Sequence, residues 1–505
     1  MGKLAEYDYI VVGAGTAGCV IASRLSEDPG ASVLVLEAGH RERTRAMTVP
    51  SAWAENLGSA ADWADMTTSQ AEAGRVPYPR GRALGGSSAV NAMAHVRGHR
   101  TVYDQWAAGG AGGWGFADLL PYFRRSENAT ERDRQLRGTD GPIRVGPATE
   151  RHPVARAFAE ALTAVGCPVT DDLSGQRQEG VAWIDLAIAG GQRVSSADAY
   201  LRPALSRPNL AIETDCLVTG LGIQRGRCTS VRYLRSGAPV RAEAAAEVIL
   251  SAGAIGSPQL LMHSGIGPAR PLRSLGIDVV ADVAGVGDNL QDHPVVLVSC
   301  ASPGKLPGSR YNNGEMCAAL RSERADAYPD LHLFPILLPL APAGLEPPAA
   351  GYALAAGVVA PDSRGAVRLA SAEPGAAPLI DPGFLTDDRD TARLEDGLRL
   401  IRAATGSGAF AAVRGAEVWP GPLVQADADL RSYIRHSVGS YYHPAGTCRM
   451  GSDAGAVVDP ALHVRGVTGL RVADASIMPT IPNAHPNATV LAIAERAAEL
   501  IRGPG

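Results

Sequence analysis

The sequence predicts an α/β protein with a doubly wound, Rossmann-like domain. Three observations support this prediction. The N-terminus has a strand, a glycine turn, a helix, a second strand and an acid in that order, glycine-rich turns recur further along the chain, and the last residues have the apolar spacing of a helix. Because neither an internal repeat nor a long linker is visible in the 505 residues, we expect domains that are joined closely rather than hinged.

The composition is ordinary for a soluble globular protein, with 46% hydrophobic and 20% charged residues. A net charge of −5 gives no electrostatic reason to expect nucleic acid or an anionic membrane surface as a partner. No apolar run reaches the ~18 residues that a membrane-spanning helix needs. The seven cysteines are scattered without CxxC spacing, which favours reduced thiols and a cytoplasmic location over disulfides or a zinc knuckle.

The N-terminal unit has the order of a dinucleotide-binding motif. Residues 7–12 form a β-rich run, and Gly13 then permits a tight turn. Gly15 lets the backbone approach a pyrophosphate, and Gly18 lets the helix pack closely on the strand. Glu37 stands nineteen residues beyond Gly18, where a carboxylate can accept hydrogen bonds from a ribose. An acid there favours FAD or NAD over NADP, and a glycine-rich structural turn is the alternative.

A second glycine-rich segment, residues 80–98, reads RGRALGGSSAVNAMAHVRG. Its Gly-Gly-Ser-Ser turn removes side chains where a flat or charged group must come close, while Arg80, Arg82 and Arg97 supply positive charge. A surface loop with helix-capping serines is the alternative. Two later segments repeat the pattern: VILSAGAIGSPQLLMHSGIGP at 248–268 and VAGVGDNLQDHP at 283–294.

Together with the C-terminal block, these segments resemble the glucose-methanol-choline family of flavoprotein oxidoreductases, in the family's order and over essentially the whole chain. The resemblance implies FAD bound by a doubly wound domain, with a second domain whose larger, mainly antiparallel sheet covers the isoalloxazine ring. The whole protein is then α/β (α+β overall) with interleaved domains. We expect residues 1–145, 190–300 and 440–505 in the FAD-binding domain, and 146–189 and 301–439 in the substrate-binding domain.

The resemblance also implies which residues meet the cofactor. They are Gly13, Gly15, Thr16, Ala17, Gly18, Glu37, Ala38, Arg82, Gly85, Gly86, Ser87, Asn91, Ala92, Val218, Ala252, Gly253, Asp474, Ala475 and Asn487. Some family members attach the flavin covalently through a histidine in the glycine-serine loop. The matching position here is Val90, so we expect non-covalent FAD.

Two of the eleven histidines attract attention as catalytic candidates. An alcohol oxidation needs a base, and an imidazole can accept a proton at neutral pH. His443 lies in SYYHPAGTCRMG and His485 in IPNAHPNATV, and each precedes a proline that favours extended backbone. A metal site lacks a third ligand at sensible spacing. A nucleophilic pair of His443 with Cys448 is a weak alternative, because five residues on a proline-glycine loop assure no contact.

In the resembled family, residues at these two places face flavin N5 across the substrate. We therefore expect His443 to be the principal base and His485 to orient the hydroxyl, although the roles could be reversed or shared. The expected reaction is oxidation of an alcohol to the carbonyl with hydride transfer to the flavin. The alternative is cyanohydrin cleavage by a hydroxynitrile lyase with redox-idle FAD.

The sequence says less about the substrate and the electron acceptor than about the cofactor. We expect a primary alcohol of a polyol, sugar-like or small organic molecule, and either O₂ or another compound as electron acceptor. For the oligomeric state, we expect either a monomer or a dimer. Candidate lining stretches are Trp63–Met66, Tyr311–Met316 and His332–Leu338.

Overall fold

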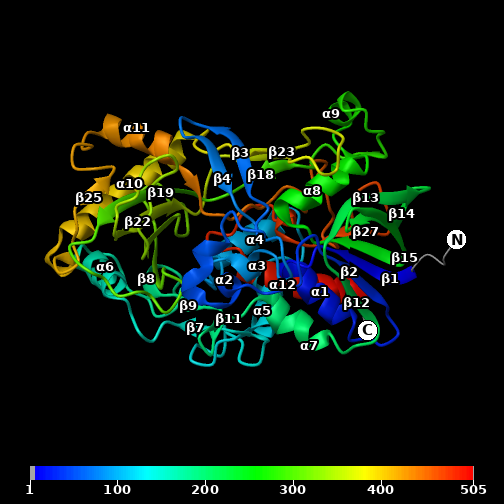
Figure 1. Ribbon diagram of the computed structural model, residues 1–505, viewed down its shortest axis with the longest axis horizontal. Helices are drawn as coiled ribbons and strands as arrows, with labels where there is room; N and C mark the ends of the chain where they lie inside the picture. The colour runs from blue at the N-terminus through cyan, green and yellow to red at the C-terminus, as the bar shows by residue number, and fades with distance from the viewer. Residues whose placement is uncertain (1–5, 504–505) are drawn as a thin grey trace.

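The computed structural model describes residues 6–503 and contains a parallel sheet at the centre of its first layer. In order across the sheet, its strands are β12 (Leu210–Glu213), β2 (Val33–Leu36), β1 (Glu6–Val12), β15 (Ala238–Leu250) and β27 (Leu470–Val472). Strands β2 and β27 are completely buried, as is the carboxyl-terminal half of β1, as expected for a parallel sheet covered on both faces. The parallel strands lie at the right of Figure 1.

The first half of β15 extends this sheet in antiparallel fashion. It pairs with β14 (Arg227–Arg235), and β14 pairs with β13 (Cys216–Gln224). The sheet is therefore mixed, and its core is formed by the parallel strands.

Helices cover the parallel strands, and the glycine turn after β1 allows one close contact. A Cβ on Gly18 would lie 1.9 Å from the Gly13 carbonyl oxygen, so only glycine lets the helix pack here. Arg24 and Glu495 form an ion pair between the first and last of these helices. The helices are α1 (Thr16–Leu25), α5 (Phe116–Ser126), α8 (Gly253–His263) and α12 (Asn487–Arg502).

A second, entirely antiparallel sheet forms the other half of the molecule, at the left of Figure 1. In order it contains β25 (Glu417–Trp419), β19 (Pro294–Ala301), β22 (Gly351–Val358), β21 (Leu331–Ile336), β20 (Met316–Leu320) and β8 (Gly180–Trp183), with β26 (Gly439–Ser440) also beside β19. Helix α10 (Asp388–Gly406) packs against it. A Cβ on Gly397 would come 2.8 Å from that of Ala356, so this helical glycine gives up some helix propensity for close packing.

A smaller five-stranded sheet lies near the top of Figure 1, between the two larger ones. It contains β18 (Asp288–Leu290), β23 (Gly365–Arg368), β24 (Leu379–Asp381), β3 (Asp65–Gln70) and β4 (Gly74–Tyr78). The other α-helices are α2 (Arg45–Thr48), α3 (Ser87–Val90), α4 (Arg100–Ala108), α6 (Pro153–Ala164), α7 (Arg202–Ala204), α9 (Ala269–Ser274) and α11 (Asp427–Ser437). Two-residue strands add to them: β5 (Glu127–Asn128), β6 (Ile143–Arg144), β7 (Gly146–Pro147), β9 (Asp185–Leu186), β10 (Ile188–Ala189), β11 (Gln192–Arg193), β16 (Ile266–Gly267) and β17 (Ala281–Asp282).

The α/β fold predicted from the sequence is confirmed, with one mixed sheet whose core is parallel and one antiparallel sheet. The domain boundaries stay a proposal. Strand β19 starts at Pro294 and pairs only within the antiparallel sheet, so residues 294–300 group with the substrate-binding segments rather than with the FAD-binding ones.

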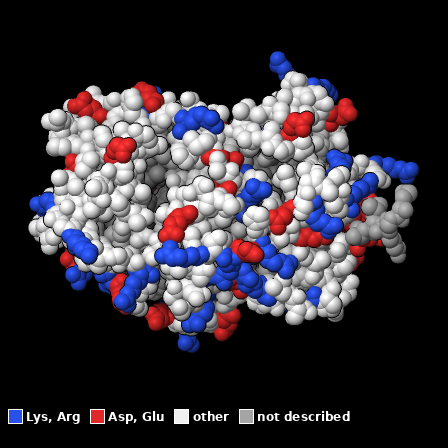
Figure 2. All heavy atoms as spheres, in the orientation of Figure 1, with Lys and Arg blue, Asp and Glu red and all other residues white. Residues whose placement is uncertain are grey.

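The surface has no separation of charge on the face drawn in Figure 2, where basic and acidic side chains are interspersed. No helix within residues 6–503 is both long and apolar enough to cross a bilayer.

Candidate active site

A cavity of about 870 Å³ lies between the two large sheets. On one side it is lined by residues at the carboxyl ends of the parallel strands, such as Val12, Leu36 and Ser251. On the other side it is lined by residues of the antiparallel sheet, such as Met316 and Phe334. Open α/β sheets bind their ligands at the carboxyl ends of the strands, so this cavity is where a dinucleotide would be expected.

Almost all the predicted cofactor residues line this one cavity. They are Gly13, Gly15, Thr16, Ala17, Glu37, Ala38, Arg82, Gly86, Ser87, Asn91, Ala92, Val218, Ala252, Gly253, Asp474, Ala475 and Asn487. The two exceptions, Gly18 and Gly85, make packing and hydrogen-bond contacts nearby. Gly18 packs α1 against the turn, and Gly85 donates its N–H to the Ala14 carbonyl, which ties the two glycine loops together.

The backbone around these glycines leaves a cradle without side chains. A Cβ on Gly86 would lie 2.6 Å from the Gly15 Cα, so the two loops cross at backbone distance. Gly253 has a φ of +78°, and a Cβ there would meet nothing within 4 Å. These features and the amino end of α1 fit a pyrophosphate-containing cofactor.

Glu37 is buried at the nucleotide end of the cavity. Its two oxygens accept hydrogen bonds from the N–H groups of Ala14 and Gly39, each 2.8 Å long. Burial raises the pKa of Glu37 to about 7. Carboxylate oxygens have further lone pairs, which suit the hydroxyl groups of a ribose.

The C-terminal residues join the cradle through hydrogen bonds. Asp474 accepts from the Gly253 N–H and from the Ser257 hydroxyl, and Asn487 Oδ1 accepts from the Thr16 hydroxyl at 3.0 Å. The amino ends of α1 and α12 therefore meet beside the cavity. Asn483, by contrast, is buried and bonds to the backbone of His99 and Pro329.

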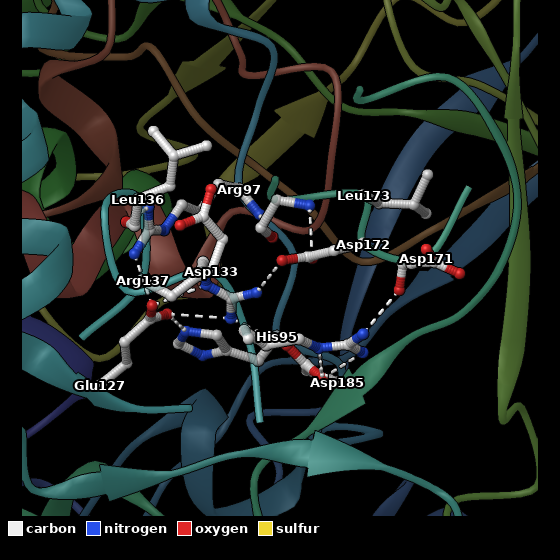
Figure 3. A network of polar contacts seen from close by, with 12 residues as sticks. His95, Arg97, Glu127, Asp133, Leu136, Arg137, Asp171, Asp172, Leu173 and Asp185 are labelled. Carbon is white, nitrogen blue, oxygen red and sulfur yellow. Dashed lines mark hydrogen bonds and ion pairs between the residues drawn. The ribbon is translucent and has the colours of Figure 1, made fainter. Parts of the chain in front are cut away.

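The position of Arg97 differs from the one expected from the sequence. The sequence analysis grouped Arg97 with Arg80 and Arg82 as positive charge for the glycine-serine loop. Arg80 and Arg82 line the cavity, but Arg97 is buried outside it and pairs with Glu127. Figure 3 shows this arginine within a network of buried ions. Because burial of an unpaired guanidinium is costly, its orientation follows the carboxylate rather than the loop.

His443 and His485, the two predicted catalytic residues, lie next to each other in the cavity. The ring centroids of His443 and His485 are 5.2 Å apart, at an interplanar angle of 72°. Tyr441 lies beside both rings, and its hydroxyl is 3.1 Å from His485 Nε2. The cavity therefore holds two imidazoles and one phenol that can act on a single substrate group.

His293 is a neighbour that the sequence analysis missed. Its Nδ1 lies 2.9 Å from His443 Nδ1, and its ring is completely buried. Only one of these two nitrogens can carry the proton of the hydrogen bond. When His443 is the donor, its Nε2 is left with a lone pair and can accept a proton. His293 also precedes a proline, as His443 and His485 do, but so does His152, which does not line the cavity, so this signal alone does not single out His293.

A fourth ring completes what we call the histidine cluster: His293, His332, His443 and His485. His332 lies 5.8 Å from His485, and Phe334 on the same strand stacks on Tyr441 at 4.6 Å. Burial lowers the pKa of His485 to about 4 and that of His293 to about 3, and it holds the pKa values of the other two well below the usual range. All four rings are therefore neutral near pH 7.

Asp292 holds the backbone of this region. Its Oδ1 accepts from the N–H groups of His293 and His443, and its Oδ2 accepts from the Ser440 hydroxyl. Burial raises the pKa of Asp292 to about 6. The carboxyl group is thus committed to placing the two histidine backbones side by side.

Cys448 takes no part in the cavity. The thiol is completely buried, burial raises its pKa well above the usual value, and its backbone N–H bonds to the Ser476 carbonyl. In the described part of the chain, no group of three or more histidine, cysteine or acidic residues is arranged to hold a metal ion.

The candidate lining stretches also contribute. Trp63 and Asp65 come from the first, residues 312–314 and Met316 from the second, and residues 334–336 from the third. Each belongs to or adjoins a strand that faces the cavity.

Comparison with known proteins agrees with this architecture. Two models of the GMC oxidoreductase family match residues 7–295 and 361–494. Human mitochondrial choline dehydrogenase is 40% identical over 99% of this chain and 90% of its own length. The oxygen-dependent choline dehydrogenase of Sinorhizobium fredii is 38% identical over 99% and 96%.

Solved structures show the same fold. Pyridoxine 4-oxidase from Mesorbium loti superimposes with a TM-score of 0.93, at 36% identity over 97% of this chain and 98% of that one. A formate oxidase variant from Aspergillus oryzae has a TM-score of 0.91, at 28% identity over 99% and 98%.

Fold and site together define an FAD-dependent oxidoreductase that acts on alcohols. More particularly, the chain belongs to the GMC oxidoreductase family, as the sequence analysis expected.

Proposed function

We propose that this protein oxidises a primary alcohol to the carbonyl, with His443 as the principal base and His485 as the group that orients the hydroxyl. The observation that carries the proposal is the pair of imidazole rings of His443 and His485, whose centroids are 5.2 Å apart, in the cavity that the cofactor residues line. FAD, which GMC oxidoreductases bind, supplies the hydride acceptor.

The protein's own part begins with proton removal. His443 shares a proton with His293 through Nδ1, so its Nε2 accepts the proton of the substrate hydroxyl. The pair formed by His485 Nε2 and the Tyr441 hydroxyl then holds the oxygen as its negative charge develops. The apolar surroundings strengthen both interactions because they exclude water.

The cofactor residues named above complete the proposal. Glu37 would hold the adenosine ribose, Val218 would meet the adenine, and Gly15 and Gly86 would border the pyrophosphate. Since Val90, the last residue of α3, lines the cavity and has no nucleophile, we propose that FAD is bound without a covalent link.

Several finer points belong to the same proposal. The substrate is a polyol, a sugar-like alcohol or a small organic alcohol, and the choline named for two relatives is one candidate. O₂ or another compound takes the electrons, and the protein is a monomer or a dimer. A cytoplasmic location is supported by seven cysteines that are all free in the structure.

An anaerobic mixing experiment tests the reaction. The purified holoenzyme is mixed with a panel of primary alcohols, and bleaching of the visible flavin absorption is followed. We expect at least one alcohol to bleach the flavin, and re-oxidation by air then separates an oxidase from a dehydrogenase. Cyanide release from cyanohydrins, with no bleaching by any alcohol, would contradict the proposal and support a lyase.

A further inference from the structure

Arg193, at the end of β11, is a buried arginine without an acidic partner. Within residues 6–503 the buried arginine side chains are Arg97, Arg137, Arg193, Arg393 and Arg471. All the others form ion pairs with carboxylates, at distances of 2.5 to 3.0 Å, whereas no ion pair of Arg193 is found in this part of the chain. Because burial of a charge without a counter-charge is costly, a guanidinium group kept in this state requires a reason beyond packing.

Asp198 is the acid whose charge acts on Arg193, but other groups already engage it. Its Oδ1 lies 3.2 Å from Arg43 and 3.0 Å from Arg202, and its Oδ2 accepts hydrogen bonds from the N–H and the hydroxyl of Ser195. Burial lowers the pKa of Arg193 to about 9, so the side chain still carries its charge near pH 7. Three guanidinium groups therefore face one carboxylate, and the local charge is positive.

The hydrogen bonds of Arg193 lead to the glycine-serine loop. Its Nη1 donates to the Ser88 carbonyl at 3.2 Å and to Asn91 Oδ1 at 2.8 Å, and its Nε donates to the Met47 carbonyl at 3.1 Å. Its Nη2 is buried and has no hydrogen-bond partner within residues 6–503. The same segment supports the loop a second time, since the Ser196 N–H donates to the Ser88 hydroxyl. The positive charge thus lies directly behind a loop that lines the cavity.

These contacts decide which way the Asn91 amide points. Its Oδ1 also accepts from the Met93 N–H at 2.9 Å, in a turn where Met93 has a φ of +58°. A guanidinium N–H and a backbone N–H can only donate, so the atom that meets both of them must be the amide oxygen. The Nδ2 group then points away from Arg193, and its two N–H donors are left for the cavity that Asn91 lines.

We propose that Arg193 positions Asn91 for contact with FAD and that its positive charge stabilises the reduced cofactor. The amide N–H donors of Asn91 suit the acceptor oxygens and nitrogens of an isoalloxazine ring. Reduction adds electrons to that ring, and a positive charge buried behind the cavity wall acts on them more strongly than it would in water. This inference rests on FAD binding and on the placement of Asn91 in the cofactor site, and not on the identity of the alcohol.

A double-variant cycle tests the contact between Arg193 and Asn91. The full-length chain, freed of FAD, is titrated with FAD as Arg193→Gln, as Asn91→Ala and as the double variant, and flavin fluorescence gives the dissociation constants. We expect each single variant to weaken binding by about tenfold or more, as loss of a buried hydrogen bond would. The double variant should bind at least about tenfold more tightly than the product of the two losses predicts. Losses that simply multiply would overturn the positioning role.

The reduction potential of the bound FAD tests the charge. Purified holoenzyme is reduced in equilibrium with a dye of known potential. We expect Arg193→Gln to disfavour reduced FAD by at least about tenfold, which lowers the two-electron potential by about 30 mV. Arg202→Gln is the matched control, because it removes an arginine that pairs with Asp198 and should leave the potential unchanged. Equal potentials in the two variants would overturn the electrostatic role.

Arg193→Lys serves if Arg193→Gln does not fold. A single ammonium group lacks the planar fork that reaches Asn91 and the Met47 carbonyl together. Its FAD binding should be weakened by at least about threefold, and addition of Asn91→Ala should weaken it little further. Unchanged affinity in Arg193→Lys, or a full further loss on addition of Asn91→Ala, contradicts the inference. None of these measurements uses an alcohol, so they still decide if the proposed oxidation fails.

Discussion

His95 Nε2 lies 2.9 Å from the carboxylate of Glu127, and His293 Nδ1 lies 2.9 Å from the ring of His443. Both contacts are buried, yet their surroundings differ completely. The first belongs to what we call the Glu127 network: His95, Arg97, Glu127, Arg137, Asp172 and Asp185, drawn in Figure 3. The second belongs to the histidine cluster, whose rings form no ion pair or hydrogen bond with a carboxylate among residues 6–503.

In the Glu127 network, full charges compensate one another. Glu127 Oε1 meets Arg97 and Arg137, and Arg137 also meets Asp172 at 2.6 Å and Asp185 at 2.8 Å. Although burial opposes it, the two guanidinium groups hold the pKa of Glu127 well below its usual range. The network includes His95. Residues 93–95 run along the cavity and pair with residues 185–187. The network therefore braces the cavity wall without entering it.

In the histidine cluster, burial keeps each ring neutral instead. Neutral rings can exchange protons with a substrate, whereas a fully paired ion has no such freedom. The comparison shows that burial alone does not identify a functional histidine. The group that contacts the ring decides whether the ring can exchange a proton with a substrate. Four predictions test this difference, beginning with the largest effect.

Replacement of His443 by alanine should slow flavin reduction by about 10²–10⁴-fold, which is typical for loss of a general base. Flavin content should be unchanged, because the cradle residues are separate. Stopped-flow reduction with a reactive alcohol measures the effect. His436→Ala is the matched control, since that ring is exposed on α11. Unchanged reduction in His443→Ala would refute the assignment.

Replacement of Glu127 by glutamine should destabilise the fold by about 3–5 kcal/mol, because it leaves buried guanidinium charge without compensation. Thermal unfolding of the holoenzyme measures this. Glu72→Gln is the control, since the exposed pair of Glu72 with Arg435 should contribute no more than about 1 kcal/mol. Similar losses in both variants would contradict the role given to the Glu127 network.

Replacement of His293 by alanine should slow flavin reduction by on the order of 10²-fold, because His443 loses the partner that sets its proton position and ring direction. The dissociation constant for the alcohol should change much less than the rate constant. Concentration series of anaerobic reduction separate the two. A loss confined to binding would show that His293 shapes the pocket rather than the base.

The pH dependence should give the smallest effect. An unperturbed histidine base with a pKa of about 6.5 would keep only about a quarter of its activity at pH 6. Since burial lowers the pKa of His443, whose neighbours His293, His332 and His485 are also kept neutral by burial, the base should stay unprotonated well below that. The reduction rate constant should vary less than about twofold between pH 6 and pH 8. An acid limb centred near pH 6.5 would contradict this.

Much of the fold and part of the site followed from local patterns. The strand, turn and helix from residue 6 to residue 25 need only the neighbouring side chains and Gly18, so the motif could be recognised directly. His443 and His485 stood out because each lies in a segment that resembles the GMC family and precedes a proline. His293 also precedes a proline, as does His152, but its partner lies 150 positions away along the chain.

The sequence by itself determined the N-terminal strand, turn and helix, the C-terminal helix, the order of the glycine turns and the family, because turn geometry and helix periodicity act over a few residues. Only the tertiary structure decided which rings meet. Pairing of β19 with β26 brings His293 to His443, and β21 brings His332 and Phe334 to Tyr441 and His485. Arg97 was misjudged for the same reason: its charge suggested a ligand, but long-range packing placed Glu127 beside it. Proximity of distant residues depends on the packing of whole sheets, which no local pattern encodes.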